Sequence, residues 1–200
     1  VSLWYALVGA GADNSVSFSD MTVYLVLNSA ILTLTQANVA ADNEASVIDG
    51  SVSMHIIRPV SFKFYTLATV LGQNAFRFLT GAVPVLLPGI FLAWNGFTFP
   101  SPVYLALFLA STLIGMLIMF ELTYAVGLLA FWIQRCWFLK WYLDAGMAFF
   151  GGTVVPLWFY PQGLQAVSRF LPFRYILFEP MNLFLHKVSV QEGAVSLAAG

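Results

Sequence analysis

The fold is decided by one long uncharged run, FLTGAVPVLLPGIFLAWNGFTFPSPVYLALFLASTLIGMLIMF, which extends from Phe78 to Phe120. A helix needs roughly 20 mostly apolar residues to cross the hydrocarbon core of a bilayer, so this run is long enough for two crossings. Near its centre, residues 94–102 (WNGFTFPSP) combine turn-forming residues with aromatic rings that favour a membrane interface. We therefore expect two membrane helices, over residues 73–94 and 103–134, joined by a hairpin at one membrane face.

The whole chain shares this apolar character. Of its 200 residues, 60% are hydrophobic and only 8% are charged, whereas an ordinary soluble domain has roughly 25% charged residues. The mean hydropathy is +0.85. The composition predicts an all-α fold, a polytopic transmembrane helix bundle in contact with lipid. The formal net charge of −1 offers no basic footprint for phosphates, so nucleic acid is excluded as a partner.

Charged and turn-forming residues divide the rest of the chain into further spans. We expect about five visible spans in a single domain over residues 1–200: a partial one at 1–10, then 21–41, 73–94, 103–134 and 141–158. The first is too short to cross a bilayer, and the last residues turn apolar again. We therefore expect a fragment that is truncated at both ends.

Two segments of this chain depart from a plain apolar helix. Pro84 and Pro88 each remove a backbone donor inside the third span, which predicts a kink there. Residues 159–187 mix basic residues, apolar residues and prolines, so we expect short amphipathic or re-entrant helices at the membrane interface.

The orientation follows from the basic residues, which favour cytoplasmic loops. The loop of residues 42–63 and the segment 135–140 each contain two basic residues, and they fall on the same side in this count. We expect both on the cytoplasmic side. The same count places Arg169 and Arg174 outside, which weakens the rule because both follow the fifth span closely.

Glu121 is the charged residue that interrupts the long fourth span. A carboxylate inside a membrane helix costs a few kcal/mol, of the order of 3, unless it is paired or protonated. It is therefore a candidate cation or proton site on a translocation path. The alternative is a carboxyl that faces the bundle interior, neutral or hydrogen-bonded to Tyr124 or a neighbouring helix. Arg77 could pair with it, or could extend its side chain to the interface instead.

The sequence gives no sign of an enzyme. Cys136 is the single cysteine, and His55 and His186 lie far apart, so neither a disulfide nor a His-rich metal site is expected. Motifs for nucleophilic or metal-dependent hydrolysis and the P-loop are absent. Any transport must draw its energy from a partner or a gradient.

The loop after the second span has an amphipathic pattern. Its apolar residues recur mostly at helical spacing: Val47, Ile48, Val52, Ile56 and Ile57. Such a segment can lie on the membrane surface as an interfacial helix, or can be an ordinary connector.

This loop also carries a family resemblance. Ile48-Asp-Gly followed by Ile56-Ile-Arg-Pro-Val60 resembles the signature I-x-x-G-x(6)-L-x-R-P of bacterial type-2 ABC exporter permeases. A second match lies downstream and is similar to the closing pattern of the same family: Gly151-Gly152 with Pro156, Phe159-Tyr-Pro161, Leu171-Pro-Phe-Arg-Tyr175 and Glu179-Pro180. The two matches occur in the family's order and together span most of the chain.

The resemblance implies six membrane helices, pairing with a second permease copy or a paralogue, and two ABC ATP-binding subunits on the cytoplasmic side. ATP and Mg would be bound by those partner subunits, and no cofactor by this chain. The coupling helix that receives the ATPase would lie in the loop containing Asp49, Gly50, Arg58 and Pro59. The re-entrant region would lie on the outer side of the membrane and would contain Gly151, Gly152, Pro156, Pro161, Pro172 and Arg174.

The resulting hypothesis is a multi-pass permease subunit of an ATP-driven exporter in a bacterial inner or plasma membrane. Two alternatives remain: a proton-coupled secondary transporter that uses Glu121, and a membrane scaffold that transports nothing. The substrate is open, because aromatic and Met side chains suit lipid-like cargo and lipid-facing helices equally well.

Overall fold

The computed structural model describes residues 18–93, 100–133, 135–153 and 155–199. All regular elements in these residues are helical, which confirms the predicted helix bundle. Three helical segments are long and apolar enough to cross a membrane: Val23–Ile48, Phe62–Pro88 and Pro102–Ile133. The expected partial span at 1–10 and most of the expected hairpin at 94–102 lie outside the described residues.

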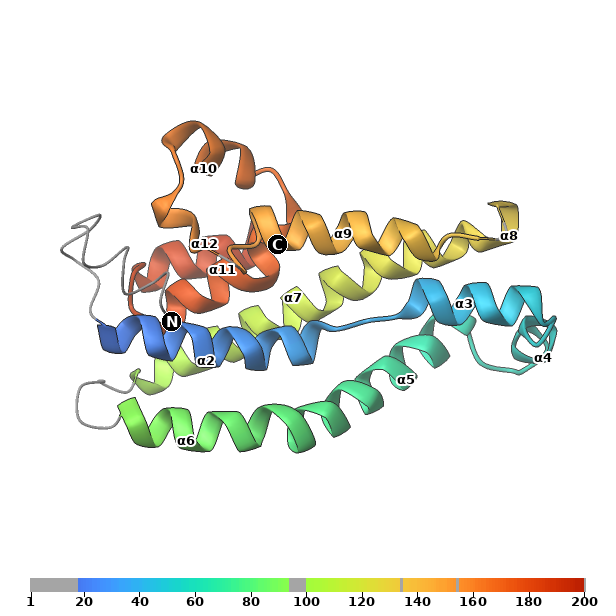
Figure 1. Ribbon diagram of the computed structural model, residues 1–200, viewed down its shortest axis with the longest axis horizontal. Helices are drawn as coiled ribbons and strands as arrows, with labels where there is room; N and C mark the ends of the chain where they lie inside the picture. Colours follow the sequence, from blue (N-terminus) through green and yellow to red (C-terminus); the bar gives the residue numbers. More distant parts are fainter. Residues whose placement is uncertain (1–17, 94–99, 134, 154, 200) are drawn as a thin grey trace.

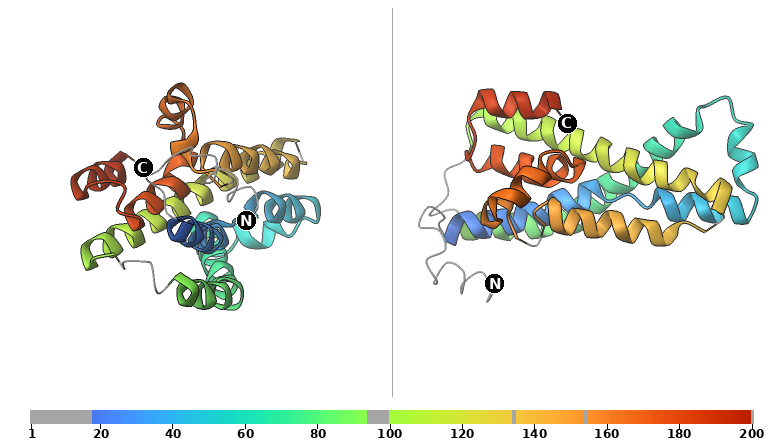
Figure 2. Two further views of the ribbon diagram at one scale, coloured as in Figure 1. Left: turned by 60° about the vertical axis from the view of Figure 1, so that its left-hand side comes forward. Right: turned by 90° about the horizontal axis from the view of Figure 1, so that it is seen from above.

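The helices run mainly along one axis (Figure 1). In chain order they are α2 (Phe18–Thr35), α3 (Val39–Ile48), α4 (Val52–Ile56), α5 (Phe62–Arg77), α6 (Val83–Ala93), α7 (Pro102–Leu128), α8 (Ala130–Ile133), α9 (Trp137–Phe150), α10 (Gln162–Ser168), α11 (Pro172–Phe184) and α12 (Val190–Ala199). The short α4 and α8 lie at the same end of the bundle (Figures 1 and 2). The two basic segments, residues 42–63 and 135–140, are therefore at the same end of the bundle.

The second span is longer than expected and is broken. Residues 36–38 separate α2 from α3, and α3 continues past Asp42 to Ile48. The side-chain amide of Asn74 on α5, which is buried, donates to the carbonyl of Leu34 at 2.7 Å. This bond gives one backbone carbonyl near the break a hydrogen-bond partner, which backbone polar groups inside a membrane need.

The third span is a continuous bent helix. It begins at Phe62, well before the expected residue 73, and passes through a π-helical turn, Phe78–Ala82, into α6. Pro84 has no N–H for the carbonyl four residues earlier, and a π turn is one way to absorb this loss. The bend expected at the prolines therefore lies between α5 and α6 (Figure 1).

The core of the bundle lies along α7. Its buried face is rich in small residues, among them Ser111, Gly115 and Gly127. A Cβ on Gly115 would lie 2.8 Å from the carbonyl oxygen of Ile176, so α11 packs directly against the α7 backbone. Small residues of this kind permit close packing of membrane helices.

The fifth helix is shorter than the expected 141–158. α9 begins at Trp137, so Lys140, which was expected in a loop, lies inside the helix and forms an ion pair with Asp144 one turn later. It ends before Gly151, and Gly152 has a φ of +76° that breaks the helix. With 14 residues, α9 is shorter than the roughly 20 residues of a full crossing.

Candidate functional site

The loop at the end of the bundle begins with a tight turn. We call residues 49–61 the tip loop. Asp49 caps the C-terminus of α3, Gly50 has a φ of +77°, and the backbone N–H of Ser51 donates to Asp49 Oδ1 at 2.8 Å. Hydrogen bonds from Ser51 lower the pKa of the Asp49 carboxyl, which stays ionised at neutral pH. Two of the expected coupling residues thus form the turn that ends α3.

The second half of the tip loop is organised by an aromatic residue of α5. The guanidinium of Arg58 lies 5.4 Å from the centre of the Tyr65 ring, and the His55 ring lies 4.9 Å from the same ring. Pro59 follows in an exposed position. Tyr65, which the sequence did not single out, connects the tip loop to the start of the third span.

The tip loop and the last residue of α3 together expose a set of large apolar side chains. They are Ile48, Met54, Ile56, Ile57 and Val60, each at least half exposed. The expected interfacial helix is thus only the five residues of α4, none of them buried. We call this set the apolar tip. Its exposure at the end of a membrane bundle is typical of a contact surface.

A buried carboxylate connects the tip region to α9. Glu44 on α3 is 9% exposed, and its Oε2 accepts the backbone N–H groups of Cys136 at 2.6 Å and Trp137 at 2.7 Å. These are free donors at the start of α9, where the helix dipole also favours a negative charge. Burial, with the nearby Glu44 carboxylate, raises the pKa of the Cys136 thiol. We call this arrangement the Glu44 cap.

Glu121 forms an ion pair with Lys63. The two side chains are 2.6 Å apart and about half exposed, and the Lys63 ammonium lies 5.9 Å from the centre of the Tyr124 ring. The partner considered from the sequence, Arg77, is therefore not the ion-pair partner of Glu121. Glu121 is thus a paired charge on the bundle surface rather than an isolated buried one.

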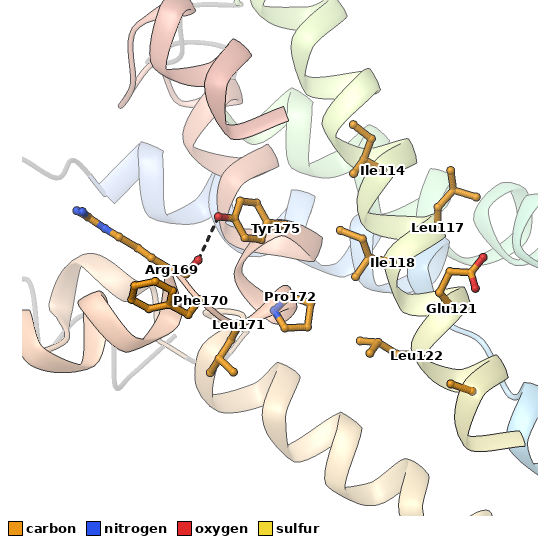
Figure 3. Close-up of a pocket in the computed structure, with 11 residues that line it drawn as sticks. Ile114, Leu117, Ile118, Glu121, Leu122, Arg169, Phe170, Leu171, Pro172 and Tyr175 are labelled. Carbon is orange, nitrogen blue, oxygen red and sulfur yellow. Dashed lines mark hydrogen bonds between the residues drawn. The ribbon is translucent and has the colours of Figure 1, made fainter. Parts of the chain in front are cut away.

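Glu121 also lines a groove of about 830 Å³ beside α7. Leu117 and Ile118 form its wall with the segment from Arg169 to Pro172 opposite (Figure 3). The hydroxyl of Tyr175 donates to the carbonyl of Arg169 at 3.1 Å, and the Arg169 side chain extends away from α7. The groove is therefore mostly apolar.

The expected re-entrant residues lie together near the other end of the bundle. The hydroxyl of Tyr24 on α2 donates to the carbonyl of Gly152 at 2.6 Å, and Pro156 is buried. Pro161 precedes α10, and Pro172 is at the start of α11, positions where the missing N–H costs nothing. Gly151 thus ends α9, and Pro156, Pro161 and Pro172 each stand at the start of a short helix.

Arg174 takes part in a buried network. Its Nε donates to Glu179 Oε1 at 2.5 Å within α11, and its guanidinium lies 4.9 Å from the centre of the Phe178 ring. A longer contact of 3.4 Å joins it to the Ser168 hydroxyl of α10. The pair neutralises two charges in a low-dielectric environment, which avoids the cost of burying either alone.

The comparison with known families identifies the class of protein. The family described as "ABC-2 family transporter protein" matches residues 14–200. This chain belongs to that family. No curated protein and no solved structure matches it.

The protein is therefore a multi-pass membrane protein, the permease subunit of an ABC transporter. This subunit performs transport and is not itself the catalyst. The family assignment agrees with the resemblance seen in the tip loop and the re-entrant segment. It favours the ABC permease over the gradient-driven transporter and the scaffold.

Proposed function

We propose that this permease works in an ATP-driven exporter of a bacterial inner or plasma membrane, with the tip loop as the docking site of its ATP-binding subunit. The observation that carries the proposal is the apolar tip, which leaves Met54, Ile56 and Ile57 exposed beside Arg58. A partner of matching shape, with an apolar cleft and an acidic rim, would cover these side chains.

The contacts of the tip region support a route for the motion. A push on α4 reaches α5 through Tyr65 and the C-terminal end of α3 through the turn at Asp49. From α3, the Glu44 cap continues to α9. Helices that are joined by such contacts can move as rigid bodies. Alternating access requires this kind of motion, because a small movement at the docking site must reach the rest of the bundle.

Membership of the family supports a complex of two permease halves with two ATP-binding subunits. ATP and Mg would be bound in those subunits and not in this chain. A second copy or a paralogue would complete the translocation path, and outward movement of substrate would follow closure of the ATPase dimer.

Co-purification tests the docking site. The full-length tagged permease is expressed with its ATP-binding subunit, and the variants Ile57→Asp and Arg58→Ala with Pro59→Ala are compared with the parent. We expect each to reduce the bound ATPase by at least about tenfold, because a central interface residue contributes about 2 kcal/mol or more.

Val167→Asp is the matched control, since Val167 is also half exposed but lies on α10. It should retain the ATPase. Full retention of the complex by both tip-loop variants would contradict the docking role.

A further inference from the structure

A small, partly open chamber with both polar and apolar walls lies between α2, α7 and α9, away from the groove beside Glu121. Its volume is about 230 Å³, close to that of roughly eight water molecules at about 30 Å³ each. Its polar lining consists of Thr35, Gln36, Lys140, Asp144 and Thr153, and its other walls are apolar. The chamber is large enough for a head group but not for a bulky solute.

The chamber is built on the broken second span. Thr35 ends α2 and Gln36 begins the break, which falls within the candidate membrane span Val23–Ile48. Non-helical backbone inside a membrane span is tolerated where it is buried in protein or lines a polar cavity. Broken helices of this kind form substrate sites in other transporters. The buried Asn74 amide, bonded to Leu34, holds the break in place from the other side.

The charges on the chamber decide which ligand it accepts. The Lys140 ammonium contacts both carboxylate oxygens of Asp144, at 2.9 and 2.7 Å. The Lys140 side chain is 20% exposed and the Asp144 side chain is 47% exposed. A ligand with one charge would pair with one of these residues and take it away from the other, which is least favourable for the more covered Lys140. A ligand with both charges can pair with both residues. When such a ligand replaces the contact between Lys140 and Asp144, no charge is left without a partner.

The hydroxyl groups of the chamber fit the same ligand. Thr153 donates its proton to the Met147 carbonyl at 3.1 Å, and Thr35 donates to the Leu32 carbonyl at 3.4 Å. Both oxygens keep lone pairs that can accept from an ammonium group. Together with Asp144 they favour the cationic part of a ligand, whereas Lys140 favours the acidic part.

We propose that this chamber binds the zwitterionic head group of an amphiphile, with its ammonium on Asp144 and its acidic group on Lys140. The proposal names the substrate class of the exporter, so it rests on the proposed function. Binding is nevertheless a property of the permease alone. It is tested without ATP and without the ATP-binding subunit, so failure here is distinct from failure of docking.

The experiment uses the full-length permease in an uncharged maltoside detergent. Two probes with the same acyl chain, lysophosphatidylethanolamine and lysophosphatidylglycerol, are titrated separately. Native mass spectrometry counts the probe molecules bound to each permease. Both contain a phosphate, and only the first has an ammonium group. The parent should bind the ethanolamine probe at least about tenfold more tightly, a difference of about 1.4 kcal/mol.

The variants separate the two charges. Asp144→Asn should weaken the binding of the ethanolamine probe about tenfold without weakening the binding of the glycerol probe. Lys140→Met should weaken both, because it removes the partner of the phosphate. Thr153→Val leaves the ion pair intact and should weaken only the ethanolamine probe, by about threefold, which keeps the test valid if a charge variant fails to fold.

Asp42→Asn and Arg77→Met are the matched controls, each removing one charge from a helix residue outside the chamber lining. Both should keep the parent affinities within twofold. The proposal is overturned if the parent binds the two probes equally well, or if Asp144→Asn changes binding no more than Asp42→Asn.

Discussion

At the scale of single residues, the acidic side chains of this permease are assigned to quite different tasks. Glu44 satisfies backbone donors at the start of α9, Asp49 stabilises the turn after α3, and Glu121 pairs with Lys63. In a membrane protein, each charge that is kept within the bundle needs such a partner.

The Glu44 cap gives a prediction about Cys136. The thiol is fully buried, and its pKa is raised by burial and by the Glu44 carboxylate. Glu44→Gln removes a negative charge beside the thiol, so its pKa should fall and more thiolate should form at a given pH. We expect faster maleimide labelling of the variant, by at least threefold at pH 7.

The pH dependence distinguishes this effect from simple opening of the site. Below the pKa of both thiols, the ratio of variant to parent labelling rates should be constant. It should decline toward one as the pH rises and both thiols become ionised. A ratio that stays the same up to high pH would mean that the substitution acts through exposure alone. Labelling of the denatured proteins at each pH gives the reference rate.

At the scale of elements, close packing of α7 decides where the re-entrant segment sits. α7 has glycines against two neighbours: Gly115 faces the backbone of Ile176 on α11, and Gly127 faces Val39 on α3. Since hydrophobic burial gives little drive between helices in lipid, such close packing is a main source of their association.

Gly115→Ala tests this packing. A Cβ would come within 2.9 Å of the Ile176 backbone, which cannot rotate away as a side chain could. We expect a loss of about 1–3 kcal/mol of stability, the usual cost of overpacking, measured as a lower thermal unfolding temperature of the detergent-solubilised protein. Gly72→Ala on α5 is the control, since nothing lies within 4 Å of its Cβ. Equal effects of both substitutions would contradict the packing argument.

At the scale of the whole molecule, two ends of the bundle are built differently. One end has the tip loop, α8 and the Glu44 cap, and the α10 to α12 segment lies toward the other (Figures 1 and 2). This arrangement suits a permease that receives mechanical input at one end. It separates the expected cytoplasmic contacts from the re-entrant helices.

The source of energy is testable at this scale. If ATP hydrolysis drives transport, loss of the proton gradient should leave transport intact, and an inactive ATP-binding subunit should abolish it. Glu121→Gln should reduce transport by no more than about fivefold, because a half-exposed ion pair contributes about 1 kcal/mol or less. Abolition of transport by this substitution, together with dependence on the proton gradient, would favour the proton-coupled alternative.

The apolar runs, the turn residues and the motif around Arg58 were enough to predict a helical membrane bundle of this family. They depend on local chemistry, since hydropathy and backbone preferences act within a few residues of chain. The i,i+4 spacing of Lys140 and Asp144 is also a local pattern, and it favours the helix that the structure has there over the loop expected at residues 135–140.

Tertiary structure alone decided the partners that lie far apart in the chain. Glu44 reaches Cys136 across 92 positions, and Lys63 meets Glu121 rather than Arg77. The chamber likewise brings together Thr35 of α2, Met119 of α7 and the Lys140–Asp144 pair of α9. Sequence distance gives no information on such contacts, because they depend on how whole helices pack, and packing follows from the combined shape of many side chains.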